Sequence, residues 1–177
     1  MVPPQSAHAV TIPGAIDAFC TLSERVGTLG LDRLLAPAIH YAEEGVPVSQ
    51  RVAFDWAEDA AVLQGVALDK YMVDGKAPSP GQMFAAPGQA AVLRKIASQG
   101  CDAFYTGDVA EDMVLALKAV GGKHSLEDFA TTACTETTPI SSTYKGIELF
   151  EHPPIGHGAT ANLILNMFKL FDIANMD

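Results

Sequence analysis

The sequence is short of cysteine and of positive charge. Its 177 residues include three cysteines, Cys20, Cys101 and Cys134, with no CxxC pair, so neither a disulfide framework nor a zinc module is expected. Each cysteine has apolar or small neighbours, which predicts a buried, unreactive thiol. Lys and Arg total 11 against 21 Asp and Glu, and the formal net charge of −10 repels phosphate backbones and anionic lipid heads. Nucleic acid is therefore not an expected partner.

The sequence also lacks the runs that mark a membrane span or a secretory signal. The longest apolar stretch near the C-terminus, 159–171, is interrupted by Asn162, Asn166 and Lys169 and is shorter than the roughly 20 residues that cross a bilayer. The first eight residues lack the basic and apolar regions of a signal and look like the middle of a polypeptide. We expect no membrane segment, and the compartment stays open.

The chain does have the composition of a folded globular protein. Hydrophobic residues make up 49% and charged residues 18%, over a length that suits one domain. We therefore expect a single domain over 1–177. Prolines and glycines between residues 65 and 88 predict an irregular connection within it.

Helical periodicity dominates the pattern of apolar residues. The predicted helices are 15–26, 34–44, a third from the cap Ser49 to about 63, then 89–99, 108–120 and 159–171, with a capping box at Ser125–Asp128. Pro37 is expected to kink or divide the second helix. Short β-favouring runs at 135–138 and 147–151 predict a hairpin with a longer loop over 141–146. The expected fold is mainly α with one small β-hairpin near the C-terminus.

Nucleophilic and metal chemistry have no local signature. No Gly-x-Ser-x-Gly turn occurs, and the pairs Thr131-Thr132 and Thr137-Thr138 are interpreted as strand-forming residues. The histidines form no HExxH or HxH motif, and zinc at the close pair His152 and His157 is less expected than ordinary loop histidines. The five histidines are His8, His40, His124, His152 and His157.

Anion and acid–base sites are equally weak. Backbone N–H groups at Gly156-His157-Gly158 could hold an anion, but the patterns GxGxxG and GxxxxGK[ST] are absent. Adjacent carboxylates on a helix point about 100° apart and cannot share a substrate proton, so they are interpreted as solvated faces. These pairs are Glu43-Glu44, Glu58-Asp59, Glu111-Asp112 and Glu127-Asp128. We expect no catalytic, cofactor-binding or metal-binding residue in this chain alone.

Six phrases nevertheless occur in a family's order along nearly the whole chain. They are VTIPGA at 10–15, LLAPAI with AEEGVPV at 34–48, AFYTGDVA at 103–110, GG with LEDF at 121–129, PI with YKG at 139–146, and PPIGHG at 153–158. In this order they resemble the large subunit of γ-glutamyltranspeptidases and of their cephalosporin-acylase-like relatives, which are N-terminal nucleophile hydrolases. The PPIGHG phrase is closer to the PPNGQG form of the acylase-like branch than to the PPxSSGG form of transpeptidases.

The resemblance implies an enzyme that cleaves itself to expose a threonine. The threonine hydroxyl attacks a γ-glutamyl or related amide bond, and its free α-amine is the base. In the family that threonine begins the small subunit, which is the implied partner, and the region matched here does not include it. The chain would then be the helical part of the large subunit of an αββα fold, without amidase activity by itself.

Another class of function stays open at this point. The chain could be a non-catalytic helical interaction module that shares only the scaffold. If it is instead a segment of a larger fold, exposed apolar surface predicts self-association. The expected contact regions are the hairpin, 135–151, and the stripe Leu163, Met167 and Phe171.

Overall fold

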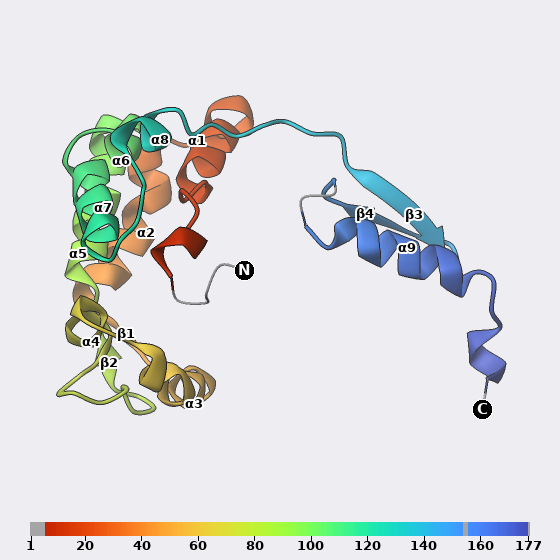
Figure 1. The fold of residues 1–177 in the computed structure, drawn as a ribbon, viewed down its shortest axis with the longest axis horizontal. Coiled ribbons are helices and arrows are strands. Elements are labelled where there is room, and N and C mark those ends of the chain that lie inside the picture. The colour runs from red at the N-terminus through yellow and green to blue at the C-terminus, as the bar shows by residue number, and fades with distance from the viewer. Residues whose placement is uncertain (1–5, 154–155, 177) are drawn as a thin grey trace. The chain divides into compact units, whose positions relative to one another are not determined.

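A computed structural model describes residues 6–153 and 156–176 (Figure 1). The chain divides into two compact units, Met1–Cys134 and Thr135–Asp177. The structure is mostly helical with a few short strands, which confirms the predicted class at that level. The single-domain organisation of 1–177 stays a prediction. Part of the PPIGHG phrase, 154–155, lies outside the described residues.

The first unit is built from helices with one pair of very short strands (Figure 1). Its helices are η1 (Ala7–Ala9), α1 (Ala15–Val26), α2 (Leu31–Glu44), α3 (Gln50–Asp59), η2 (Ala60–Val62), α4 (Val66–Tyr71), α5 (Pro87–Gln99), α6 (Asp102–Tyr105), α7 (Gly107–Ala119) and α8 (Leu126–Ala130), where η marks a 3₁₀ helix; its strands are β1 (Val46–Pro47) and β2 (Met83–Phe84). Helix α2 packs along α5, and an ion pair between Glu43 and Arg94 joins them. In the described part of the chain, no helix is long and apolar enough to cross a bilayer.

Local capping signals set several helix ends as predicted. Helix α1 has the expected bounds and ends at Gly27. The Ser49 hydroxyl accepts a hydrogen bond from the backbone N–H of Val52, 3.4 Å away, at the start of α3. The Ser125 hydroxyl and the Asp128 carboxylate form the predicted capping box at the start of α8.

Other local predictions are wrong, for identifiable reasons. Helix α2 begins at Leu31 and continues through Pro37. A proline removes one intrahelical hydrogen bond, and the remaining bonds with the packing against α5 hold the helix together. Strand β1 pairs antiparallel with β2, Val46 opposite Phe84, and strands of two residues leave no periodicity to detect. The predicted irregular connection agrees with the structure, because 65–88 contains only the short elements α4 and β2 before α5 begins at Pro87.

The core of the first unit lies where α6, α7 and α8 meet. Phe129 and Ala110 are fully buried there, together with Tyr105 and Val114. The Tyr105 hydroxyl donates to the Pro13 carbonyl oxygen over 2.7 Å and accepts from the Asp17 N–H over 3.0 Å. Burial raises the pKa of this phenol, which keeps it protonated as a donor. The VTIPGA and AFYTGDVA phrases therefore meet at one tyrosine.

The prediction of three buried free thiols is wrong. Cys20 and Cys101 form a disulfide, with their Cα atoms 6.3 Å apart, and join α1 to the start of α6. The residues are 81 positions apart, so only the tertiary fold brings them together. Cys134 is free but exposed. The Asp17 carboxylate beside it raises the pKa of its thiol, which disfavours a reactive thiolate.

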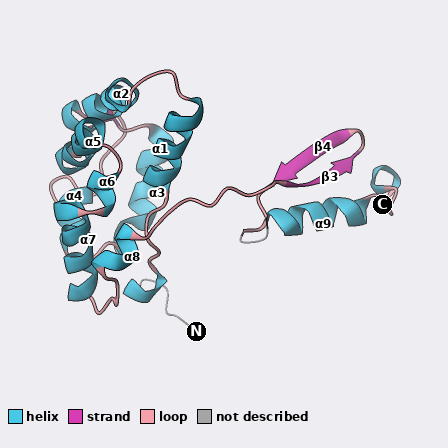
Figure 2. Cartoon of the chain, turned by 90° about the horizontal axis from the view of Figure 1, so that it is seen from above, coloured by secondary structure: helices cyan, strands magenta, loops and turns pink. Residues whose placement is uncertain are grey.

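The second unit is a hairpin covered by one helix. It contains β3 (Ile140–Tyr144), β4 (Ile147–Glu151), α9 (Gly158–Phe168) and the 3₁₀ helix η3 (Ile173–Asn175). The strands are antiparallel, with Ile140 opposite Glu151, and α9 lies along them (Figures 1 and 2). The Ser142 hydroxyl donates to the Asn162 Oδ1 over 2.6 Å, and both residues are buried.

The first strand of the hairpin and its loop have bounds that differ from the prediction. Residues 135–138 belong to no strand, and most of the predicted loop, 141–146, is strand β3. Lys145 and Gly146 have positive φ angles of 49° and 80°, which is the conformation of a two-residue type I′ turn. The turn is therefore tight, and the polar residues before it are paired in the ladder instead of looping out.

Candidate functional site

A hollow of about 360 Å³ lies beside α3 in the first unit. Its wall consists of residues at helical spacing on one face of α3, continued by Leu63 after η2 and completed by a tyrosine of α4. The lining residues are Val52, Asp55, Trp56, Asp59, Leu63 and Tyr71. In the sequence, Val52, Trp56 and Leu63 recur at helical intervals. In the structure this face borders an open hollow, and Val52 is 46% exposed.

Aromatic packing holds the indole of Trp56 in place. Phe84 of β2 contacts it edge to face, with ring centroids 4.7 Å apart. Tyr71 of α4 also lies beside the Trp56 ring, in a tilted arrangement with ring centroids 6.5 Å apart. Such pairs are stabilised by the aromatic quadrupoles in addition to area burial. The unpredicted strand pair β1–β2 thus supplies the support for the hollow's largest side chain.

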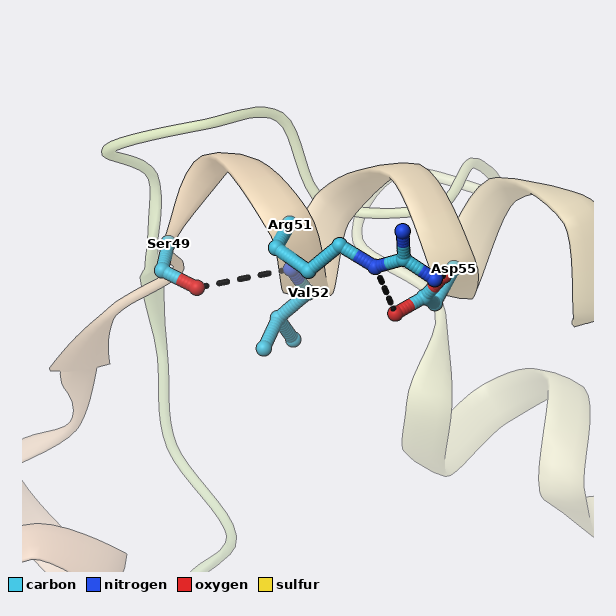
Figure 3. Close-up of polar contacts among 4 residues, drawn as sticks. All are labelled: Ser49, Arg51, Val52 and Asp55. Atoms are coloured by element: carbon cyan, nitrogen blue, oxygen red, sulfur yellow. Dashed lines mark hydrogen bonds and ion pairs between the residues drawn. The ribbon is translucent and has the colours of Figure 1, made fainter. Parts of the chain in front are cut away.

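The two carboxylates of the hollow differ in whether a positive charge pairs with them. Arg51 binds Asp55 through two nitrogens of its guanidinium (Figure 3): Nε lies 2.8 Å from Oδ2 and Nη2 lies 2.7 Å from Oδ1. Asp59, one turn later on the same face, has no hydrogen bond or ion pair with any described residue. The hollow therefore presents one neutralised carboxylate and one free carboxylate beside an aromatic wall.

This arrangement is suited to binding, because its reactive groups are not paired for catalysis. None of the six described lining residues is a serine, threonine, cysteine, histidine or lysine. Nucleophilic catalysis needs a nucleophile with a base in hydrogen-bond reach, and neither the Asp59 carboxylate nor the Tyr71 hydroxyl has a hydrogen-bond partner among the described residues. The hollow is therefore a candidate binding site.

A second cleft of about 730 Å³ lies between α5 and α7. Its Lys95 forms an ion pair with Asp108, and this contact holds the pKa of the Asp108 carboxyl below its ordinary value. The cleft's lysine is thus already used within the protein. We therefore treat the α3 hollow as the stronger candidate.

The threonine pairs have roles that differ from the prediction. Thr131 Oγ1 donates to the Glu127 carbonyl over 2.7 Å, and Thr132 Oγ1 donates to the Asp128 carbonyl over 2.8 Å. Both hydroxyls thus satisfy carbonyls at the end of α8 and belong to no strand. The pair at 137–138 lies in an extended stretch outside the strands.

The histidines are dispersed over both units. His8 lies in η1 and His40 lies beside Tyr41 in α2. His124 Nε2 donates to the Val10 carbonyl over 2.8 Å, while its buried Nδ1 has no hydrogen-bond partner among the described residues. His152 follows β4, and His157 is the N-cap of α9. Within 6–153 and 156–176, no three His, Cys, Asp or Glu residues gather as metal ligands would.

The contacts of the acidic pairs and of the glycine loop are mostly structural. Of the acidic pairs, Glu43 binds Arg94, Asp128 closes the capping box, and Asp59 lines the hollow. At Gly158 an added Cβ would lie 2.7 Å from Glu151 Cβ and 2.8 Å from the His152 carbonyl oxygen. The backbone needs glycine there for close packing of α9 on β4. This packing accounts for the glycine without an anion.

Comparison with known proteins gives matches over the whole chain. Residues 1–177 match the family model for gamma-glutamyltranspeptidase. A glutathione hydrolase-like YwrD proenzyme of Bacillus subtilis is 32% identical over 96% of this chain and 33% of its own length. The acylase ACY 1 proenzyme of Pseudomonas sp. strain SE83 is 33% identical over 96% of this chain and 31% of its own. The crystal structure of cephalosporin acylase from Bacillus halodurans superposes with a TM-score of 0.87 at 34% identity, over 99% of this chain and 34% of that one.

Proposed function

Because the chain belongs to the gamma-glutamyltranspeptidase family, we propose that it forms the helical part of the large subunit of an amide-cleaving N-terminal nucleophile hydrolase. The family match over residues 1–177 is the observation that carries this proposal. The chain spans about a third of the length of the curated relatives described above. In this proposal the chain supplies scaffold, and the remaining two thirds supply the reactive groups.

In the complete enzyme the nucleophile is the N-terminal threonine of a small subunit. Its hydroxyl oxygen attacks the amide carbon, and its α-amine accepts the hydroxyl proton and returns it to the leaving nitrogen. Water, or a second amine, then releases the acyl group from the threonine. The chain described here contributes the packing on which that subunit assembles an αββα core.

The matched phrases support a scaffold role through their contacts. VTIPGA and AFYTGDVA are joined at Tyr105. The end of the LLAPAI…AEEGVPV phrase forms β1 against β2, and the last phrase begins α9 at Gly158. Each of these four phrases thus contributes to where an element begins, ends or packs. The interaction-module alternative is not favoured, because the family match covers the chain from end to end.

The acyl group is a γ-glutamyl group or a related acyl group. Relatives named for glutathione hydrolysis and for acylase activity match at nearly equal identity, 32% and 33%. The PPIGHG phrase favours the acylase-like branch.

We expect self-association of the isolated chain through its exposed apolar residues, among them Phe150 and Leu163. Sedimentation over a dilution series checks this, and a monomer at every concentration would contradict it.

The decisive experiment compares the 177-residue chain with a full-length family enzyme in which this chain replaces the third that it matches. Both are assayed with a γ-glutamyl anilide and with an N-acyl cephalosporin. The longer polypeptide should cleave itself before a threonine and hydrolyse at least one amide, while the chain alone should turn over neither. Hydrolysis by the chain alone, abolished by one substitution within 1–177, would overturn the proposal.

A further inference from the structure

We propose that the α3 hollow binds a small organic monocation, namely a primary amine that carries an aromatic or branched apolar group. The hollow's residues take no part in the amide cleavage proposed above, so this binding does not depend on it. Three properties of the hollow carry the inference: its size and apolar wall, its one free carboxylate, and its aromatic rings.

The size fits a small molecule. At about 360 Å³ the hollow is at the lower end of the range of ligand sites, which runs from roughly 300 to 1,000 Å³. Val52, Trp56 and Leu63 supply an apolar wall, which recognises a hydrocarbon group. A ligand that is charged throughout would leave this wall unused.

The free carboxylate sets the sign and number of charges. Asp55 is already paired by the two arms of Arg51, so it attracts a further cation only weakly. Asp59 lies one turn away on the same face and has no partner among the described residues. One uncompensated carboxylate calls for one positive charge on the ligand. The formal charge of −10 on the whole chain also attracts cations.

The aromatic rings favour a cation over a neutral polar group. Trp56 and Tyr71 both line the hollow, and their ring faces attract an ammonium group or a C–H bond beside it. Phe84 fixes the Trp56 ring through the edge-to-face contact, so ligand binding does not have to order that side chain. An arylalkylamine satisfies the wall, the carboxylate and the rings together.

Trp56 makes the test direct, because it is the only tryptophan in the sequence. Phenethylamine is titrated into the 177-residue chain while the Trp56 emission is followed. Phenylacetate and 2-phenylethanol are the anionic and neutral controls of the same shape. We expect saturable binding of phenethylamine with a Kd of about 1 mM, ordinary for so small a ligand, and much weaker binding of both controls.

Two charge variants should act in opposite directions. Asp59→Asn removes the free carboxylate and should weaken phenethylamine binding about tenfold, whereas Glu58→Gln, the same charge change off the lining face, should leave it unchanged. Arg51→Gln frees Asp55 and should tighten binding about threefold. Damage to the fold would not tighten binding, so this second variant separates recognition from instability.

The outcomes that overturn the proposal are definite. One is an emission of Trp56 that does not saturate with phenethylamine, or that responds equally to phenylacetate. Equal effects of Asp59→Asn and Glu58→Gln would show that only the overall field matters. Weaker binding by Arg51→Gln would show that Asp55 is not part of the site.

Discussion

The contacts that stabilise each of the two units differ in how far apart their residues lie in the sequence. In the first, Cys20 and Cys101 are 81 residues apart, Tyr105 and Pro13 are 92 apart, and Cys134 N donates to Asp17 across 117. In the second, the buried hydrogen bond of Ser142 and Asn162 spans 20 residues. The first unit is thus stabilised by cross-links between distant segments, and the second by neighbours.

The difference extends to what each unit buries. The first unit has a cluster around Phe129 that is closed to solvent. In the second, Ile147 is 74% and Phe150 is 62% exposed, and the Asn162 amide nitrogen has no partner among the described residues. A hairpin with one helix buries little apolar area for its length. The first unit should therefore unfold at higher denaturant concentration than the second.

Removing the disulfide should produce the largest loss of stability in the first unit and so reduce the difference in stability between the two units. The double variant Cys20→Ser with Cys101→Ser opens a loop of 81 residues, which should lower the free energy of unfolding of the first unit by about 4 kcal/mol. Trp56 emission in urea measures this, because the only tryptophan lies in that unit. Cys134→Ser is the control and should leave the midpoint unchanged. An equal midpoint in the double variant would show that the bond does not stabilise the unit.

A substitution at Gly158 should weaken the second unit alone. An added methyl group would approach the His152 carbonyl oxygen to 2.8 Å, so Gly158→Ala should cost about 2–3 kcal/mol as α9 is displaced from β4. Hydrogen exchange of the α9 amides measures the loss. Gly156→Ala meets nothing within 4 Å and is the matched control. If both variants exchange alike, the close packing of Gly158 is not what holds the helix.

Tyr105→Phe tests the long-range hydrogen bonds of the first unit. It removes the donor to Pro13 and the acceptor for Asp17, and should cost about 1–2 kcal/mol. The same change at Tyr144, whose hydroxyl forms no hydrogen bond with a described residue, should cost less. Urea unfolding of both variants makes the comparison. A larger loss at Tyr144 would reverse the contrast drawn between the units.

The capping box should give the smallest effect, and one that depends on pH. Hydrogen bonds from Ser125 hold the pKa of the Asp128 carboxyl below its ordinary value of 3.8. A lowered folded-state pKa means that this stabilisation is complete above about pH 4 and is lost as the pH falls through the folded-state value. Asp128→Asn should flatten that part of an acid titration of the first unit. Glu127→Gln keeps the box and should retain the dependence.

Features with local causes could be predicted from the sequence, and features with distant causes could not. The bounds of α1, the Ser49 cap and the Ser125 capping box depend on residues within a few positions of one another. The Cys20–Cys101 bond and the β1–β2 pair depend on segments that only the fold brings together.

The candidate site shows the same limit. Helical spacing identified the face of α3 that carries Val52 and Trp56, but the spacing does not say what lies opposite. The structure places a hollow there, with Asp59 free and Asp55 held by Arg51. The Arg51–Asp55 pair could have been inferred from the i, i+4 spacing of the two residues in the sequence. The sequence does not indicate that this face of α3 borders an open hollow.

The Tyr105 anchor has a consequence for synthesis on the ribosome. The start of α1 is synthesised before its hydrogen-bond partner Tyr105, which follows Pro13 by 92 residues. Until that tyrosine leaves the exit tunnel, α1 lacks this anchor and its apolar side is open to chaperones. Contacts of such high sequence separation also slow folding. Helix α1 is therefore synthesised well before it can reach its final position in the first unit.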